Sequence, residues 1–362
     1  MKLSIPDNIK AIQPYKAGKP IEELQREYGI FDSIKIASNE NPFGPSPLAA
    51  RAIREAVLNL HRYPDSSGYE LIEKIAEKQS VKPENVVLGN GSDDIIGMLT
   101  TALLSPGDEV IMPRPSFLMY EILTRSAGAE PVFVPLKKLS IDLETIGEKM
   151  TPRTRMVFLC NPNNPTGTVF SKRDFQNFQK IIPRDVVVVI DEAYIEFVRD
   201  PDCAQGIEYF ESDRAIVTMR TFSKAYGLAG LRIGYGIMPE ILSEILNRIR
   251  QPFNTSSLAQ AGALAALDDE DFLTRTTRLI HAGLDFLYAS LDTLGIPYFP
   301  TQANFFLIDV GQSADAVFEN MLRQGVIVRS MTSYGYPEYI RINVGLEEEN
   351  ARFVDVLRKV LR

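Results

Sequence analysis

The feature that most constrains the fold is an alternation of short apolar runs with longer stretches of helical pattern. Each run is rich in valine and isoleucine, and each ends in polar residues, glycine or proline. Continuous apolar strands separated by helices are typical of a parallel sheet that is covered on both faces. We therefore predict an α/β fold with a mostly parallel sheet sandwiched by helices. The predicted strands are 85–89, 108–112, 155–160, 185–191 and 214–219.

The most unusual polar segments of the chain directly follow these strands. Open α/β sheets bind their ligands outside the carboxyl ends of the strands. We therefore expect one binding site at that edge, built from five loops. The loops are GNGSDD (89–94), RPSF (114–117), NPNNPTG (161–167), DEAY (191–194) and TFSK (221–224).

The first and last of these loops predict a site for a phosphate group. The glycine-rich turn leads from a strand into a helix, which directs the backbone N–H groups of Ser92 and Asp93 at an anion. Thr221 and Ser223 offer hydroxyls, and Arg232 offers a bidentate, charge-assisted pair. A dinucleotide is not expected, because aspartate stands where that motif has its third glycine.

The DEAY loop and two neighbouring loops fit an aromatic ring with a basic nitrogen. Asp191 ends a buried strand, where an unpaired carboxylate is costly, so it either pairs with a protonated pyridine nitrogen or serves as a helix cap or salt bridge. Tyr194 and Asn164 can hydrogen-bond a ring hydroxyl. Phe117 can stack on the ring, although a lone phenylalanine is more often part of the core.

Lys224 lies among glycine, alanine, serine and threonine rather than among charged residues. Small neighbours let the backbone approach a flat cofactor, and partial burial lowers the pKa of a lysine so that it can form a Schiff base with an aldehyde. The alternative is a solvated loop lysine. If Lys224 were a solvated loop lysine, it would be a coincidence that five loops all fit the same kind of cofactor.

The pattern changes after residue 256. Residues 269–295 read as one long helix, and strands are expected at 304–310, 326–329 and 339–345. The first forty residues read as an extended arm laid against something else. We predict an N-terminal arm (1–40), a large cofactor-binding domain (41–256) and a small C-terminal domain with the linking helix (257–362).

Over nearly its whole length the chain resembles pyridoxal-phosphate enzymes of the aspartate-aminotransferase fold, fold type I. The resemblance is carried in order by PYKAGKP, ASNENPFGPSP, RYPD, GNGSDD, CNPNNPTG, VIDEAYIEF, RTFSKAYGLAGLRIGYG, QPFNTS, ANFFLID, VIVRS and YIRINVG. The lysine loop with Asp191, Tyr194 and NPTG is specific for the fold. NENPFG and LAGLR are more specific for the histidinol-phosphate aminotransferase family, which the chain resembles most.

The resemblance implies a role for each candidate in binding pyridoxal 5'-phosphate. Lys224 would hold the aldimine and move the proton, with Asp191 on the pyridine nitrogen and Tyr194 and Asn164 on the phenolic oxygen. Phe117 would stack on the ring. The phosphate would be held by Ser92, Asp93, Thr221, Ser223 and Arg232.

The same resemblance implies a partner subunit and a substrate site. Tyr63 of RYPD would reach the cofactor phosphate of the neighbouring subunit, which implies a homodimer with shared active sites. If the family resemblance is set aside, Tyr63 is interpreted as an amphipathic surface residue. Arg341 would grip the anionic group of the substrate. Arg329 and Tyr15 would help to bind the phosphate of histidinol phosphate, and Asn41 of NENPFG would also belong to the substrate site. An arginine on a strand, such as Arg329, more often makes a salt bridge.

The implied reaction is a ping-pong transamination between histidinol phosphate and 2-oxoglutarate, giving imidazole-acetol phosphate and glutamate, as in histidine biosynthesis. An aromatic or broad-range aminotransferase is the alternative, since one anion clamp accepts a carboxylate or a phosphate. A decarboxylase of an amino-acid phosphate and a DNA-binding regulator that keeps the fold are further alternatives. The regulator is disfavoured because no basic helical segment precedes the fold.

Composition excludes several other classes of protein. The net charge is −8 and the pI about 5.1, which argues against a nucleic-acid partner. We expect neither a membrane span nor an export signal, because no apolar run has the needed length. The expected location is therefore the cytoplasm. No metal site is expected, because the two histidines and two cysteines lack paired metal-ligand spacing.

Overall fold

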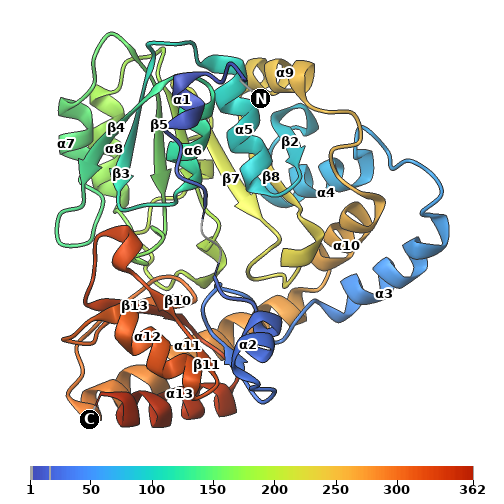
Figure 1. Ribbon diagram of the computed structural model, residues 1–362. Helices are drawn as coiled ribbons and strands as arrows, with labels where there is room; N and C mark the ends of the chain where they lie inside the picture. The colour runs from blue at the N-terminus through green and yellow to red at the C-terminus, as the bar shows by residue number, and fades with distance from the viewer. Residues whose placement is uncertain (1–2, 16–17, 362) are drawn as a thin grey trace.

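A seven-stranded sheet forms the centre of the computed structural model, which describes residues 3–15 and 18–361 (Figure 1). Its strand order is β2-β8-β7-β6-β5-β3-β4, and β8 runs antiparallel to both of its neighbours while the pairs among β3 to β7 are parallel. The predicted fold class is confirmed. The strands are β2 (Val86–Gly89), β3 (Glu109–Arg114), β4 (Glu130–Pro135), β5 (Thr154–Cys160), β6 (Val187–Asp191), β7 (Ile216–Thr221) and β8 (Gly234–Ile237).

Apolar layers cover both faces of this sheet, which explains the continuous apolar runs. In β6, Val187 and Val189 belong to one buried cluster, whereas Val188 and Ile190 belong to another. Successive side chains of a strand point to opposite faces, so each layer takes every second residue. The first cluster includes residues of α5 (Ser92–Leu103), α6 (Met119–Ser126) and α9 (Glu240–Ile249). The second includes residues of α7 (Leu143–Glu148) and α8 (Lys172–Ile181).

Two strands of the sheet were not expected from the sequence. β4 is an edge strand that is largely half-exposed and contains two prolines, so it lacks a continuous apolar run. β8 contains Gly234 and Gly236, and glycines in a sequence indicate a turn. Here they admit close packing, because a Cβ on Gly234 would lie 2.8 Å from the backbone nitrogen of Ser92.

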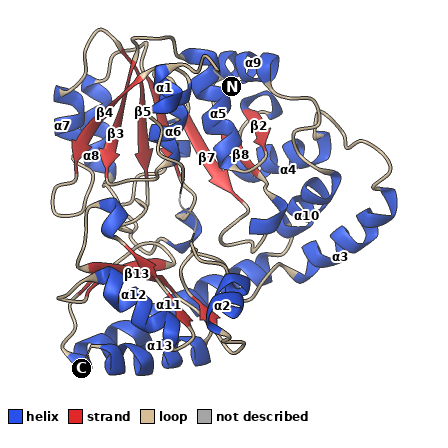
Figure 2. Cartoon of the chain, in the orientation of Figure 1, coloured by secondary structure: helices blue, strands red, loops and turns tan. Residues whose placement is uncertain are grey.

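A smaller group of strands lies below the large sheet in Figure 2. The four-stranded sheet has the order β12-β13-β10-β9, and every pair in it is antiparallel. Its strands are β9 (Tyr298–Phe299), β10 (Phe305–Asp309), β12 (Arg329–Ser330) and β13 (Tyr339–Asn343), and α12 (Ala314–Arg323) and α13 (Glu347–Val360) pack against its core. The predicted strand at 326–329 is divided, because β11 (Val326–Ile327) pairs instead with β1 (Ile34–Lys35).

The predicted long helix is confirmed as α11 (Glu270–Leu294). Asp269 caps its first turn by accepting a hydrogen bond from the backbone N–H of Phe272, and Gly295 ends it with a φ of +67°. Both termini follow the usual capping preferences, which is why the sequence predicts them closely.

The expectation of an extended N-terminal arm is wrong for part of the arm. The segment contains α1 (Asp7–Lys10) and α2 (Ile21–Tyr28). Leu24 of α2 is buried with Leu322 and Ile327, so the helix packs on the C-terminal unit, as Figure 1 shows. The amphipathic pattern of α2, with proline before it and Gly29 after it at a φ of +68°, favours this helix.

The remaining helices lie beside the β2 edge of the large sheet. α4 (Tyr69–Gln79) and α10 (Ser257–Leu267) share a buried cluster with β2 and β8, and α3 (Pro47–Ala56) packs on α10. In Figure 1, α3 stands at the right margin of the molecule. Short 3-10 helices are Val57–Asn59, Pro83–Asn85, Ile195–Phe197, Gly206–Tyr209, Ala229–Leu231 and Thr332–Tyr334. None of the helices in the described part of the chain is long and apolar enough to cross a membrane.

Candidate active site

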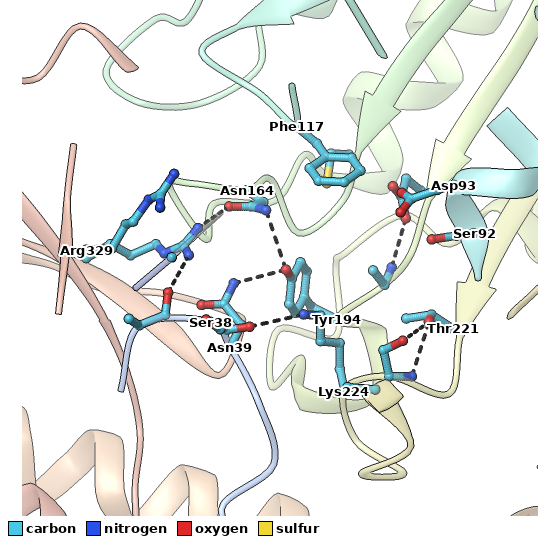
Figure 3. Close-up of a pocket in the computed structure, with 18 of the residues that line it drawn as sticks. Ser38, Asn39, Ser92, Asp93, Phe117, Asn164, Tyr194, Thr221, Lys224 and Arg329 are labelled. Atoms are coloured by element: carbon cyan, nitrogen blue, oxygen red, sulfur yellow. Dashed lines mark hydrogen bonds between the residues drawn. The ribbon is translucent and has the colours of Figure 1, made fainter. Parts of the chain in front are cut away.

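A pocket opens at the carboxyl ends of the central strands. Cys160, Asp191 and Thr221 are the last residues of β5, β6 and β7, and all three line it. Arg329 and Arg341 line it from the four-stranded sheet. In Figure 3 the pocket has two ends, with Ser92, Asp93 and Thr221 at one and Arg329 at the other.

Lys224 lies in this pocket three residues beyond the end of β7, and its side chain is half-buried. Its Nζ donates a hydrogen bond to the backbone carbonyl of Ser38 at 3.3 Å and lies 5.6 Å from the ring centroid of Tyr194. Burial, followed by the positive charge of Arg341, lowers the pKa of Lys224 from 10.5 to about 8. An amine with this pKa is neutral in a large fraction of molecules near pH 8, and a neutral amine is a base and a nucleophile.

Asp191 is a buried carboxylate that accepts two hydrogen bonds from the described residues. One oxygen, Oδ1, accepts from the backbone N–H of Ala193 at 3.2 Å, and Oδ2 accepts from the hydroxyl of Tyr120 at 2.6 Å. Burial raises the pKa of Asp191 from 3.8 to about 6, and the bond from Tyr120 opposes this rise. In the described part of the chain no ion pair to Asp191 forms, so the helix-cap alternative and the salt-bridge alternative both lack support.

Tyr194 and Asn164 meet at the floor of the pocket. The hydroxyl of Tyr194 accepts hydrogen bonds from the side-chain amides of Asn39 at 3.0 Å and Asn164 at 3.5 Å. Burial raises the pKa of Tyr194 above its usual range, so the phenol stays protonated and keeps a proton to donate. Phe117 lies across the pocket from Tyr194 in Figure 3.

The other predicted phosphate-binding groups gather at the N-terminus of α5. Arg232 approaches Asp93 at 3.5 Å through Nη2 and donates to the Ser223 hydroxyl at 3.4 Å through Nη1. The Thr221 hydroxyl lies 3.0 Å from that of Ser223. With the N–H groups of the first turn of α5, these side chains form an open, positively polarised cradle.

The arginines define the second end of the pocket. Arg341 is buried, and its Nη1 donates to Asn164 Oδ1 at 2.5 Å while Nη2 donates to the carbonyl of Ala37 at 3.1 Å. Its Nε is among the buried side-chain atoms without a partner in the described residues. Burial lowers the pKa of Arg341, and the charge of Arg329 adds to this effect. Tyr15 lines the same pocket and is partly exposed.

Two predicted site residues do not line the pocket. Asn41 points away from it, because its side-chain amide donates to the carbonyl of Ala225 at 2.9 Å and to Thr276. Tyr63 is 82% exposed and stacks on Phe253 with the ring centroids 4.6 Å apart. Both assigned roles stay predictions, and the one for Tyr63 concerns a neighbouring subunit.

Sequence reasoning missed several residues at the pocket. Asn39 stands two positions before Asn41 in the same motif, and its φ of +57° is rare outside glycine. Tyr120 lies behind the pocket and does not line it; it follows Phe117 by one helical turn but reads as an ordinary core aromatic. The further lining residues are Gly18, Ala37, Ser38, Cys160, Ala193, Ala229 and Tyr334.

Comparisons with known proteins agree with this geometry. The model of the family "Aminotransferase class I and II" matches residues 32–357. Histidinol-phosphate aminotransferase 2 of Carboxydothermus hydrogenoformans is 46% identical over 354 residues, which are 98% of this chain and 98% of the relative. Histidinol-phosphate aminotransferase of Desulfotalea psychrophila is 47% identical over 366 residues, 100% of this chain and 96% of the relative. The chain belongs to the histidinol-phosphate aminotransferase family.

Solved aminotransferase structures have the same fold as this chain. Histidinol-phosphate aminotransferase from Sinorhizobium meliloti, in complex with pyridoxal-5'-phosphate, superposes with a TM-score of 0.91 at 27% identity and covers 99% of this chain and 97% of that one. An aspartate aminotransferase mutant of Thermus thermophilus gives a TM-score of 0.86 at 26% identity, with 99% and 100% covered. The resemblance to the histidinol-phosphate aminotransferase family and to fold type I is thus confirmed.

Proposed function

We propose that this chain is a pyridoxal-phosphate-dependent transaminase that interconverts histidinol phosphate and 2-oxoglutarate with imidazole-acetol phosphate and glutamate. One observation carries the proposal: a half-buried lysine of lowered pKa and a buried carboxylate share a pocket that has an arginine at each end. The names of relatives that are 43–47% identical over nearly the whole chain support the substrate.

The residues of the pocket fit pyridoxal phosphate. A Cβ on Gly91, whose φ is +80°, would lie 2.5 Å from Arg232 Nη2, so glycine keeps the anion cradle open. Among the described residues Asp191 has no cationic partner, which suits a protonated ring nitrogen. We assign the phenolic oxygen to Tyr194 and Asn164 and the ring face to Phe117. We assign the phosphate to Ser92, Asp93, Thr221, Ser223 and Arg232.

When bound, the cofactor supplies an aldehyde carbon that exchanges amines and a ring that accepts electrons from the substrate α-carbon. Lys224 Nζ then takes and returns the proton at that carbon, for which a pKa of about 8 is well placed. Asp191 holds its negative charge in a dry setting and so favours a positive ring. Because one cofactor serves both amino donors in turn, we expect ping-pong kinetics.

The arginine end of the pocket favours substrates with a double negative charge. Arg329 and Arg341 line this end of the pocket, and the positive charge of Arg329 contributes to the lowered pKa of Arg341. A phosphate monoester or a dicarboxylate brings two negative charges to the two arginines, whereas a single carboxylate brings one. Histidinol phosphate and 2-oxoglutarate both satisfy this demand, and an aromatic amino acid does not.

We further propose that the active protein is a homodimer. The segment from the end of α3 to Tyr63 exposes large apolar side chains, among them Leu58 at 81% and Tyr63 at 82%. Val57 and Leu60 are exposed beside them. Several exposed apolar side chains within one short segment indicate a protein interface, and Tyr63 would reach the neighbouring cofactor phosphate from it.

Single-turnover spectra test the substrate. The cofactor-loaded protein is mixed with histidinol phosphate, and a full conversion of its absorption spectrum is expected, with a much slower change for phenylalanine. No change with histidinol phosphate, together with full conversion by phenylalanine, would make the protein an aromatic aminotransferase. Borohydride treatment in the presence of pyridoxal phosphate should tag the peptide that contains Lys224, and absence of the tag would overturn the cofactor assignment.

A further inference from the structure

Tyr120 reaches Asp191 from outside the pocket. Its hydroxyl donates to Asp191 Oδ2 at 2.6 Å, the shorter of the two hydrogen bonds to this carboxylate. Tyr120 itself is completely buried and does not line the pocket. It therefore cannot contact a substrate, and any effect on the reaction must pass through Asp191.

The ring of Tyr120 is held firmly by its neighbours. It stacks on Phe158 of β5 with the centroids 4.6 Å apart and the planes 2° from parallel. It also meets Phe117 edge-on at 5.5 Å. Because stacking fixes the ring, the hydroxyl is aimed at Asp191 Oδ2 before any ligand binds.

Asp191 would be a stronger base without this bond. Its surroundings include Asp93 from α5, Glu192 from its own segment, Cys160 from β5 and Tyr194, and none of them is a cation. Burial already raises the pKa of Asp191 to about 6, and the Tyr120 hydroxyl counteracts it by hydrogen-bonding the charged form. A carboxylate that is too basic takes the proton from a bound ring nitrogen, and the ring then loses the charge that makes it an electron acceptor.

We infer that Tyr120 is a positioning residue whose hydroxyl orients Asp191 and keeps the proton shared by Asp191 and the ring nitrogen on the nitrogen. The inference rests on the proposed function, since it needs a pyridine nitrogen beside Asp191. Neither proton nor electron is gained or lost, because only the position of one proton between two bases is set.

The experiment uses the whole protein loaded with pyridoxal phosphate that carries ¹⁵N in its ring. In the wild type, the ¹⁵N resonance is expected at the value of a protonated pyridine from pH 6 to pH 9. In Tyr120→Phe, it should move toward the unprotonated value, with kcat lower by about tenfold and KM for histidinol phosphate within about twofold.

The matched control is Tyr235→Phe, which removes the hydroxyl of another buried tyrosine of the large domain that does not line the pocket. It should leave the resonance unmoved. An unmoved resonance in Tyr120→Phe would overturn the inference and leave a purely structural role. If Tyr120→Phe does not fold, 3-fluorotyrosine at position 120 keeps the shape and strengthens the donor. The nitrogen of this variant must then stay protonated to a higher pH than in the wild type, above pH 9.

A failure of the proposed function is distinguishable from a failure of this inference. If the wild-type protein binds no pyridoxal phosphate, there is no ring resonance in any variant. If the wild type binds the cofactor and transaminates but both tyrosine variants behave like it, only the role of Tyr120 is lost.

Discussion

At the scale of single residues, the properties that make Lys224 useful also cost stability. The lysine is half-buried, no carboxylate of the described residues forms an ion pair with it, and its pKa falls from 10.5 to about 8. Between these two values the unfolded chain binds more protons than the folded one, so the stability of the cofactor-free protein rises with pH. Below about pH 8 Lys224 is charged in both the folded and the unfolded chain, so the folded protein bears the full free-energy cost of a charged lysine in this pocket.

Replacing Lys224 with methionine should therefore stabilise the cofactor-free protein while abolishing its activity. We expect the free energy of unfolding to rise by about 3 kcal/mol at pH 7, and the gain to shrink as the pH increases from 8 toward 10.5. Urea unfolding at several pH values measures this. The same change at the exposed Lys149 is the control, and an equal gain at all pH values for Lys224→Met would contradict the explanation.

Asp191 should matter through its charge rather than its shape. Asp191→Asn keeps the size of the side chain but removes the negative charge that favours a protonated ring, so kcat should fall by at least about a hundredfold. Steady-state kinetics with histidinol phosphate measure the loss. Asp285→Asn makes the same chemical change on the exposed face of α11 and should alter kcat by less than twofold. Comparable rates in both variants would remove the argument for a pyridinium ring.

At the scale of elements, the sequence predicts best where one physical demand dominates. β6 must be apolar on both faces, and α11 has a side-chain cap at one end and a glycine at the other, so both were expected at nearly the correct residues. β8 was missed because its glycines serve close packing on α5 rather than a turn. α2 was missed because its partner surface, around Leu322, lies almost three hundred residues away in the chain.

Most residues that line the pocket were also predictable from the sequence. Strand ends of a parallel sheet converge, so loops that follow them meet, and 13 of the 15 predicted site residues line the pocket. The sequence does not show which asparagine of the NENPFG motif points into the pocket. Asn39, which has a positive φ, donates a hydrogen bond to Tyr194 there, and Asn41 does not. The contact of Tyr120 with Asp191 joins a helix to a strand, and no spacing rule predicts it. The domain limits at residues 41 and 257 stay a prediction.

The turn before α5 offers a test of the anion cradle. Gly91→Ala should weaken the binding of pyridoxal phosphate by at least about tenfold, because the new Cβ at a φ of +80° would press on Arg232. Gly107→Ala is the matched control: its φ is +93°, but no atom of the described residues lies within 4 Å of the new Cβ. Both variants should lose about 1 kcal/mol of stability to backbone strain. Fluorescence titration measures the affinity for the cofactor. Equal affinities of the Gly91→Ala and Gly107→Ala variants would show that Gly91 is needed only for its backbone conformation.

At the scale of the whole molecule, the apolar segment beyond α3 is the feature that a single chain does not explain. Leu58 is more exposed than most apolar side chains, and Tyr63 stacks on Phe253 without covering either ring. If two chains meet there, Tyr63 belongs to the active site of the partner. Assembly and catalysis then depend on the same surface.

A charge on this surface should therefore abolish both properties together. Leu58→Asp is expected to convert the dimer to a monomer in analytical ultracentrifugation and to lower kcat by more than about tenfold, because an unpaired carboxylate in an apolar interface is costly. Ile181→Asp is the control, since Ile181 is 54% exposed on α8, at the other margin of the molecule from α3 in Figure 1. A fully active Leu58→Asp monomer would show that each chain holds a complete site, and that Tyr63 acts only as a surface residue.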